Sequence, residues 1–208
     1  MKILIGDDHS VVRKGLIQII LEEYPLAQIT ECADGIEMQE IVNHNMFNII
    51  ISDISMPNRL GLNFIKEIKD VQPKTPLLIL TMHAAEQYEL RVIKSGARGF
   101  LNKESAPEEL IDAIKILLVG IKYMSKETEL ALSKTKVKNL TKLPHDTLSS
   151  REFEVFNLMI QGVSPLQISQ KLTIGPTTVS TFKKRVFAKI GVTSLADLVR
   201  YAVDNGLH

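Results

Sequence analysis

The sequence predicts an α/β domain built on a doubly wound, five-stranded parallel sheet, followed by a smaller all-α domain of four helices. In the first 120 of its 208 residues, short β-rich runs alternate with helical stretches. Two of these runs, 47–51 and 77–80, are almost continuously apolar, which is typical of parallel strands buried on both faces. From residue 147 onward no strand pattern appears, and one helix-starting sequence follows another.

The expected elements of the first half alternate strictly. We expect strands at 2–5, 28–31, 47–52, 76–81 and 99–101. We expect helices near 10–22, 35–44, 60–70, 86–94 and 107–119. In a doubly wound sheet of this kind, functional side chains gather beyond the C-terminal ends of the strands.

The chain changes character after residue 120. Residues 121–146 are rich in Lys, Thr and Ser, so we expect a linker with one weak helical turn. Residues 147–208 predict the helical domain, because each expected helix begins with good capping chemistry. The expected capping residues are Ser149, Ser164, Gly175 and Ser194.

Composition excludes several classes of protein. With 45% hydrophobic and 24% charged residues, the chain is neither disordered nor a collagen-like repeat or coiled-coil rod. Its apolar runs are far shorter than the ~20 residues that span a bilayer. The chain begins without a signal-peptide layout, and a single cysteine, Cys32, cannot form an internal disulfide. We therefore expect a soluble, cytoplasmic protein with no membrane partner.

Charge is distributed unevenly along the chain. Residues 1–120 carry 12 Lys and Arg against 17 Asp and Glu, a net charge of −5. Residues 121–208 carry 13 against 7, a net charge of +6. This division favours two separate roles, with an anionic partner for the second half, although a chance fluctuation of charge is the alternative.

Polar side chains follow four of the five expected strands. Asp7 and Asp8 follow the first strand, Asp53 the third and Lys103 the fifth, and Thr81 ends the fourth. Three carboxylates at one sheet edge repel one another and require a cation, and oxygen ligands suit Mg²⁺. A neighbouring ammonium and hydroxyl could then bind phosphoryl oxygens. The alternative is a set of unrelated, solvated loop residues.

This pattern resembles the receiver domain of bacterial response regulators, a flavodoxin-like fold, over residues 1–120. The matching motifs are Asp7-Asp8, Asp53-Ile54-Ser55-Met56-Pro57 with Gly61, Thr81, and Phe100-Leu101-Asn102-Lys103. The resemblance implies that Asp53 accepts a phosphoryl group from a sensor histidine kinase. It also implies roles for the neighbouring groups: Mg²⁺ would be held by Asp7, Asp8, Asp53 and the backbone carbonyl of Ser55, while Lys103 and Thr81 would bind the phosphoryl oxygens.

The family's Thr/aromatic switch is implied at Thr81 and Phe100. When Thr81 moves toward the phosphoryl group, Phe100 could rotate into the vacated space. The alternative for Phe100 is an ordinary core aromatic. His83 lies where the family tunes the lifetime of the phosphorylated state, although a solvated loop histidine is an equal alternative.

The stretch from Pro176 to Ile190 predicts an amphipathic helix suited to a DNA major groove. Apolar residues at helical spacing form one stripe, namely Val179, Phe182, Val186 and Ile190. The opposite side carries Thr177, Ser180, Thr181, Lys184 and Ala188, with the cationic residues Lys183, Arg185 and Lys189 at its flanks. Short side chains let a helix approach base edges, and long cations reach phosphates. A merely solvated cationic face is the alternative.

The second half also resembles a known domain. The run from Leu148 to Val155, Gly162, Ile168, Leu172, Thr178 to Thr181 and Lys189 to Val192 are similar to the LuxR-type DNA-binding domain. With the receiver, this identifies the chain as similar to the NarL/FixJ response regulators. The resemblance implies that Ser180, Thr181 and Lys184 face the groove and that Lys183 and Lys189 contact phosphates. Pro165 and Gln167-Ile168-Ser169 depart from the family pattern on the supporting helix.

We therefore expect a phosphorylation-controlled transcription factor, not an enzyme beyond its own phosphoryl uptake and loss. Its expected partners are a sensor histidine kinase, double-stranded promoter DNA and a second copy of the chain. Residues 147–208 carry only seven Lys and Arg against four Asp and Glu, so dimerisation would be needed for useful DNA occupancy. The alternatives are a regulator with a phosphate-independent receiver and a phosphoryl-transfer enzyme acting on outside substrates.

Overall fold

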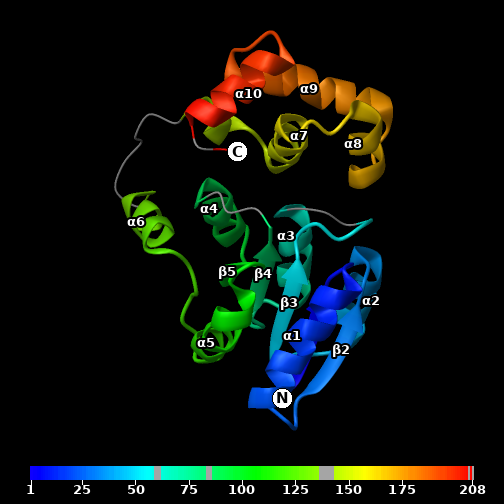
Figure 1. The fold of residues 1–208 in the computed structure, drawn as a ribbon, viewed down its shortest axis with the longest axis vertical. Coiled ribbons are helices and arrows are strands. Elements are labelled where there is room, and N and C mark those ends of the chain that lie inside the picture. The colour runs from blue at the N-terminus through cyan, green and yellow to red at the C-terminus, as the bar shows by residue number, and fades with distance from the viewer. Residues whose placement is uncertain (59–61, 83–85, 136–142, 206, 208) are drawn as a thin grey trace. The chain divides into compact units, whose positions relative to one another are not determined.

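The computed structural model describes residues 1–208 except 59–61, 83–85, 136–142, 206 and 208. Gly61 and His83, named above, lie outside the described residues. The chain divides into two compact units, Met1–Ala131 and Leu132–His208, whose elements are labelled in Figure 1. Within the described parts of the chain, none of the helices combines the length and apolar character needed to cross a membrane.

Among the described residues, the first unit contains a five-stranded parallel sheet in the order β2-β1-β3-β4-β5. The strands are β1 (Lys2–Gly6), β2 (Gln28–Cys32), β3 (Ile49–Asp53), β4 (Leu77–Thr81) and β5 (Gly99–Asn102). The strand order reverses between β1 and β3, which is where doubly wound sheets place their sites. The predicted fold class is confirmed.

Helices cover both faces of this sheet. They are α1 (Ser10–Glu23), α2 (Gly35–His44), α3 (Leu62–Val71), α4 (Glu86–Lys94) and α5 (Ala106–Leu118). On one face, α1 and α5 pack against each other and enclose a core that includes Ile5 and Ile51. Leu4 and Ile50 alternate with those residues along the strands, so they point to the opposite face, and they are equally buried. Helices α2, α3 and α4 pack in succession beside one another.

Residues 121–131, expected to begin the linker, lie in the first unit instead. Tyr123 forms a parallel β-bridge with Gly99 of β5. The helix that follows, α6 (Lys126–Thr135), has 10 residues and is longer than the single weak turn that we expected. Its first turn is held by Glu89 of α4, a distant contact that the local sequence does not reveal.

The second unit is helical, as predicted. A 3-10 turn, η1 (Pro144–Thr147), precedes α7 (Ser150–Ile160), α8 (Pro165–Leu172), α9 (Pro176–Ile190) and α10 (Leu195–Asp204). The capping boxes expected at Ser149 and Ser164 are both present, and Ser194 accepts a hydrogen bond from the Asp197 N–H. Thr173 ends α8 with a left-handed backbone (φ 52°), which turns the chain toward α9.

We predict that Gly99→Ala destabilises the first unit by about 1–3 kcal/mol. A methyl group at Gly99 would lie 2.7 Å from Leu78 Cδ1 and 2.9 Å from Leu117 Cδ1. Both leucines are fully enclosed in the core, so neither side chain can move aside cheaply. Urea unfolding followed by circular dichroism measures the change. Gly15→Ala is the control, because nothing lies near an added methyl group there and a helical alanine should stabilise by about 0.5–1 kcal/mol.

Candidate functional site

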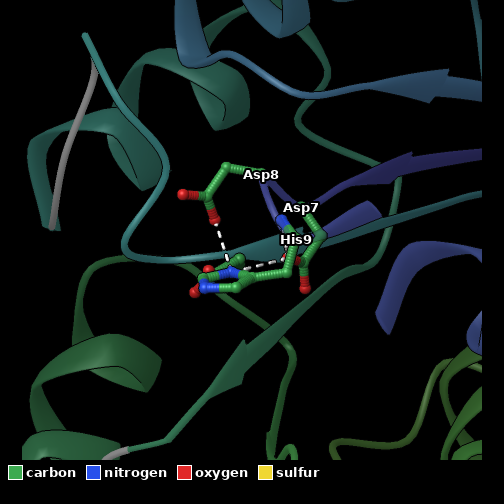
Figure 2. Close-up of side chains that lie close together, drawn as sticks. Asp7, Asp8 and His9 are labelled. Carbon is green, nitrogen blue, oxygen red and sulfur yellow. Dashed lines mark hydrogen bonds and ion pairs between the residues drawn. The ribbon is translucent and has the colours of Figure 1, made fainter. Parts of the chain in front are cut away.

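An acidic cluster lies at the point where the strand order reverses. Asp7 follows β1 and Asp53 ends β3, and both side chains are buried. Asp8 and His9 are exposed neighbours of Asp7, and one ligand-type atom of each of these four residues lies within 4.8 Å of the others. Figure 2 shows the imidazole of His9 beside the two carboxylates of Asp7 and Asp8. The structure thus brings together the carboxylates that the sequence placed at the strand ends.

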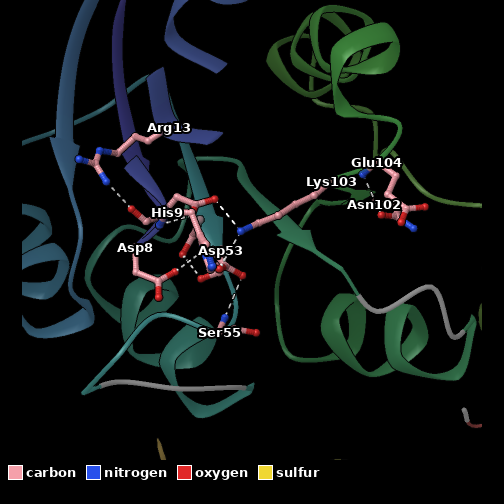
Figure 3. A network of polar contacts seen from close by, with 10 residues as sticks. Asp8, His9, Arg13, Asp53, Ser55, Asn102, Lys103 and Glu104 are labelled. Carbon is pink, nitrogen blue, oxygen red and sulfur yellow. Dashed lines mark hydrogen bonds and ion pairs between the residues drawn. The ribbon is translucent and has the colours of Figure 1, made fainter. Parts of the chain in front are cut away.

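Lys103 lies between the two buried carboxylates. Its Nζ is 2.8 Å from Asp53 Oδ2 and 2.6 Å from Asp7 Oδ2. The backbone N–H of Ser55 donates to the other oxygen of Asp53 at 2.9 Å. The two contacts to Asp53 come from two different loops, since Lys103 follows β5 and Ser55 follows β3, as Figure 3 shows. Both oxygens of Asp53 are therefore oriented by hydrogen bonds.

The charges of this site depend on a balance between burial and pairing. Burial raises the pKa of Asp53 above its ordinary value, and hydrogen bonds from Lys103 and Ser55 oppose that rise without cancelling it. Burial alone would lower the pKa of Lys103, but its hydrogen bonds to Asp53 and Asp7 outweigh burial and raise the pKa. Lys103 is therefore a firmly protonated cation beside Asp53.

The cluster also fits a divalent cation. Asp7, Asp8 and Asp53 bring three carboxylates close together, and the ammonium of Lys103 offsets only one of those charges. Hard carboxylate oxygens are the ligands that small divalent cations prefer. An acidic cluster of this composition is typical of a receiver active site.

His9 was not singled out from the sequence. Its backbone N–H donates to Asp7 Oδ1 at 2.8 Å, and its ring Nδ1 lies 2.8 Å from Asp8 Oδ1. Arg13, one turn along α1, donates to the backbone carbonyl of Asp7 at 2.6 Å. The sequence contained one signal that could have pointed to His9, namely its position between the acidic pair and the first turn of α1.

Thr81 and Phe100 project from the same face of the sheet. Thr81 pairs in register with Asn102, and Phe100 lies two residues before Asn102 on β5. Because side chains alternate along a strand, Phe100 is a diagonal neighbour of Thr81. Thr81 is fully buried and Phe100 is 9% exposed. This arrangement is compatible both with a coupled pair and with an ordinary core aromatic.

In the second unit, α9 presents two distinct sides. Val179, Val186 and Ile190 are buried and Phe182 is half-buried, so the expected apolar stripe is present. The opposite side is exposed, and it carries Thr177, Ser180, Thr181 and Lys184. The hydroxyls of Ser180 and Thr181 donate to carbonyls one turn earlier in the helix.

The flanking lysines have partners that the sequence did not indicate. Lys183 Nζ lies 5.4 Å from the centre of the Phe187 ring. Lys189 Nζ lies 2.6 Å from Glu152 Oε2 and donates to the Thr147 carbonyl at 3.1 Å. Lys189 therefore links the C-terminal end of α9 to Glu152 in the capping box of α7.

Comparisons with known proteins agree with both halves of this description. Residues 3–115 match the family described as response regulator receiver domain. Residues 146–202 match the luxR family of bacterial regulatory proteins. The chain belongs to the NarL/FixJ family of response regulators. This is a family of transcription regulators and not of conventional enzymes.

Relatives of this response regulator match along nearly its whole length. The oxygen regulatory protein NreC of Staphylococcus aureus is 33% identical over 214 residues, which cover 100% of this chain and 99% of that protein. RcsB of Salmonella enterica serovar Typhimurium, solved bound to promoter rprA with phosphomimetic BeF3⁻, is 27% identical with a TM-score of 0.68 over 97% of this chain and 98% of its own. Another RcsB structure of Salmonella typhimurium reaches a TM-score of 0.74 at 26% identity, over 98% of this chain and 97% of its own.

We predict that the Glu152–Lys189 pair makes the stability of the DNA-binding unit of this response regulator depend on pH. Burial alone would raise the pKa of Glu152, but hydrogen bonds from Lys189 and Ser149 outweigh it and lower the pKa. A lowered pKa in the folded state stabilises the fold above the ordinary glutamate pKa, and this stability is lost as pH falls through the folded pKa.

Glu152→Gln should therefore destabilise the unit by about 1–3 kcal/mol at pH 7, because a neutral amide replaces the buried carboxylate that pairs with the Lys189 ammonium. The difference from wild type should shrink as the pH falls below the ordinary range of glutamate. Urea unfolding at several pH values, followed by circular dichroism, measures it. A difference that stayed constant down to the acid limit would contradict the assigned pairing.

Proposed function

We propose that a sensor histidine kinase phosphorylates this response regulator at Asp53 and that phosphorylation controls dimerisation and promoter binding. The observation that carries the proposal is the geometry around Asp53. A buried carboxylate is held by a protonated lysine and a backbone N–H, beside two further carboxylates. That set supplies an oriented nucleophile together with cationic stabilisation for a transferred phosphoryl group.

Asp53 would act as the nucleophile of the transfer. One of its carboxylate oxygens forms the new bond to phosphorus as the phosphorus–nitrogen bond of the kinase's phosphohistidine breaks. Lys103 would bind the phosphoryl oxygens, which carry the charge that builds during transfer. Mg²⁺, held by Asp7, Asp8, Asp53 and the Ser55 carbonyl, would neutralise further phosphoryl charge when bound.

Thr81 and Phe100 would report the phosphorylated state. The Thr81 hydroxyl would hydrogen-bond to a phosphoryl oxygen, and Phe100, its diagonal neighbour on the same sheet face, would adjust to the vacated space. Because cores repack between discrete arrangements, a small displacement at Thr81 can bias a two-state receiver.

The second unit would bind promoter DNA through α9. We infer that Ser180, Thr181 and Lys184 face base edges, that Thr177 lies on the same side of the helix, and that Lys183 contacts a phosphate. The ammonium of Lys189 uses two donors within the fold, so a phosphate contact would use its third. RcsB has been solved on promoter DNA and as two dimers bound to two parallel DNAs, which supports DNA binding by a dimer here. We also propose that the protein acts in the cytoplasm, consistent with the free, buried thiol of Cys32.

We predict that wild-type protein gains one phosphoryl group when incubated with acetyl phosphate and Mg²⁺. Asp53→Asn should gain none, because an amide oxygen is a poor nucleophile at phosphorus. Intact-mass spectrometry measures the outcome. Asp70→Asn, an exposed carboxylate on α3, is the matched control and should behave as wild type. Equal uptake by the Asp53 variant would place the acceptor elsewhere.

We predict that Lys184→Ala weakens binding to an operator selected from random duplexes by about 1–3 kcal/mol, if Lys184 contacts a base edge. Fluorescence anisotropy at fixed salt measures the affinity. Arg200→Ala on α10 removes the same charge from a side chain that is 74% exposed, so it controls for net charge. Equal losses in the two variants would show a charge effect and exclude a base contact by Lys184.

A further inference from the structure

The first turn of α6 is capped by a residue of another helix. Ser125 precedes the helix, and its Oγ accepts a hydrogen bond from the Thr128 N–H at 3.2 Å, as an N-cap side chain does. In an ordinary capping box, the third helical residue is Glu or Gln and accepts the N-cap N–H in return. That residue is Thr128 here, and Glu89 of α4 accepts the Ser125 N–H instead, at 2.7 Å.

Glu89 is bound closely to this helix end. It is a carboxylate only 4% exposed, and it also accepts hydrogen bonds from Ser125 Oγ at 2.6 Å and Thr128 Oγ1 at 2.9 Å. A buried carboxylate without hydrogen-bond partners is costly, so these contacts stabilise both helices at once. A 10-residue helix is marginal by itself, and α6 therefore depends on α4 for its order.

The segment just before α6 is attached to β5. The Tyr123 carbonyl accepts a hydrogen bond from the Phe100 N–H at 3.1 Å, and the Tyr123 N–H donates to the Arg98 carbonyl at 3.0 Å. The Tyr123 hydroxyl donates to Glu109 of α5 at 2.5 Å. Residues 121–131, which we call the strap, are thus fastened to β5 at the backbone of Phe100 and to α4 at Glu89.

We propose that the strap is a conditional element, in which α6 is ordered while α4 and β5 hold their present positions and is released when Asp53 is phosphorylated. This inference rests on the proposed function. Thr81 ends β4, the strand directly before α4, and Phe100 carries one of the strap's attachments on β5. A displacement of Thr81 and Phe100 therefore acts on both attachments of the strap, the one to Glu89 of α4 and the one to the Phe100 backbone of β5.

Release would act on the DNA-binding unit through the chain itself. Helix α6 starts in the first unit and runs into the second, which begins at Leu132. Loss of Glu89 leaves the Ser125 N–H and the hydroxyls of Ser125 and Thr128 without their acceptor, and this favours fraying from Ser125 onward. Helix α6, which precedes the connection to α7, then loses the anchor of its first turn.

Hydrogen exchange with mass spectrometry on the full chain tests the proposal. Peptides covering 121–131 are compared between untreated protein and protein phosphorylated by acetyl phosphate with Mg²⁺. Glu89→Gln is measured untreated, with Glu40→Gln as the control because Glu40 is an exposed glutamate on α2. We expect exchange in the strap about fivefold faster after phosphorylation and about fivefold faster in Glu89→Gln, with no change in Glu40→Gln.

Ser125→Ala is a second test of the same contact, used because Glu89→Gln changes a buried residue and its effect must be separated from misfolding. It removes a hydroxyl contact to Glu89 from the strap side and should also speed exchange in 121–131 while leaving β1 and β3 peptides unchanged. Normal strap protection in both Glu89→Gln and Ser125→Ala would overturn the dependence of α6 on α4.

The same samples separate this proposal from the proposed function. Intact mass is recorded beside exchange, so phosphoryl uptake is known in every sample. Uptake without faster exchange in the strap would overturn release and leave Asp53 as the acceptor. Absence of uptake would overturn phosphorylation as the trigger, whereas the two untreated variants would still decide whether Glu89 orders α6.

Discussion

Two buried carboxylates, Asp7 and Asp53, share the ammonium of Lys103, and the arrangement of the first unit keeps these three charges together. Each charge would be costly in the core by itself, and in this site each is compensated by another. The three residues come from the ends of β1, β3 and β5, which are far apart in the sequence. The doubly wound order places β1 beside β3, so the backbone topology, rather than any local motif, holds the site together.

The protein compensates its buried carboxylates in three different ways. Asp7 and Asp53 divide one lysine between them, which leaves the cluster anionic and suited to a further cation. Glu152 forms an ion pair with Lys189 and stabilises the fold of the second unit. Glu89 is held by neutral hydroxyl and amide donors, a weaker arrangement than an ion pair. The weakest of the three therefore lies at the junction between the receiver and the rest of the chain.

Much of the fold could be predicted because its signals are local, and the acidic site could be predicted because each of its residues ends or follows a strand of the expected sheet. The capping boxes at Ser149 and Ser164 depend on residues three positions apart, and the buried strands reveal themselves as apolar runs. The contacts that sequence reasoning missed join distant segments. In the sequence, Glu89 looks like an ordinary surface glutamate of a helix, because its contact with Thr128 of α6 joins distant segments. Lys189 likewise looks like a free cation, because its partner Glu152 lies on α7.

The position of Tyr123 affects where the receiver can be joined to a different effector domain by gene fusion. In the described part of the sheet, β5 is an edge strand, and Tyr123 covers part of its open hydrogen-bonding side. Uncovered edges invite strands from other molecules. The receiver family match ends at residue 115, so this cover lies beyond it. A recombination that joined a new effector at residue 115 would produce a receiver whose β5 edge lacks this cover, whereas one that joined it after the strap would keep the cover at Gly99.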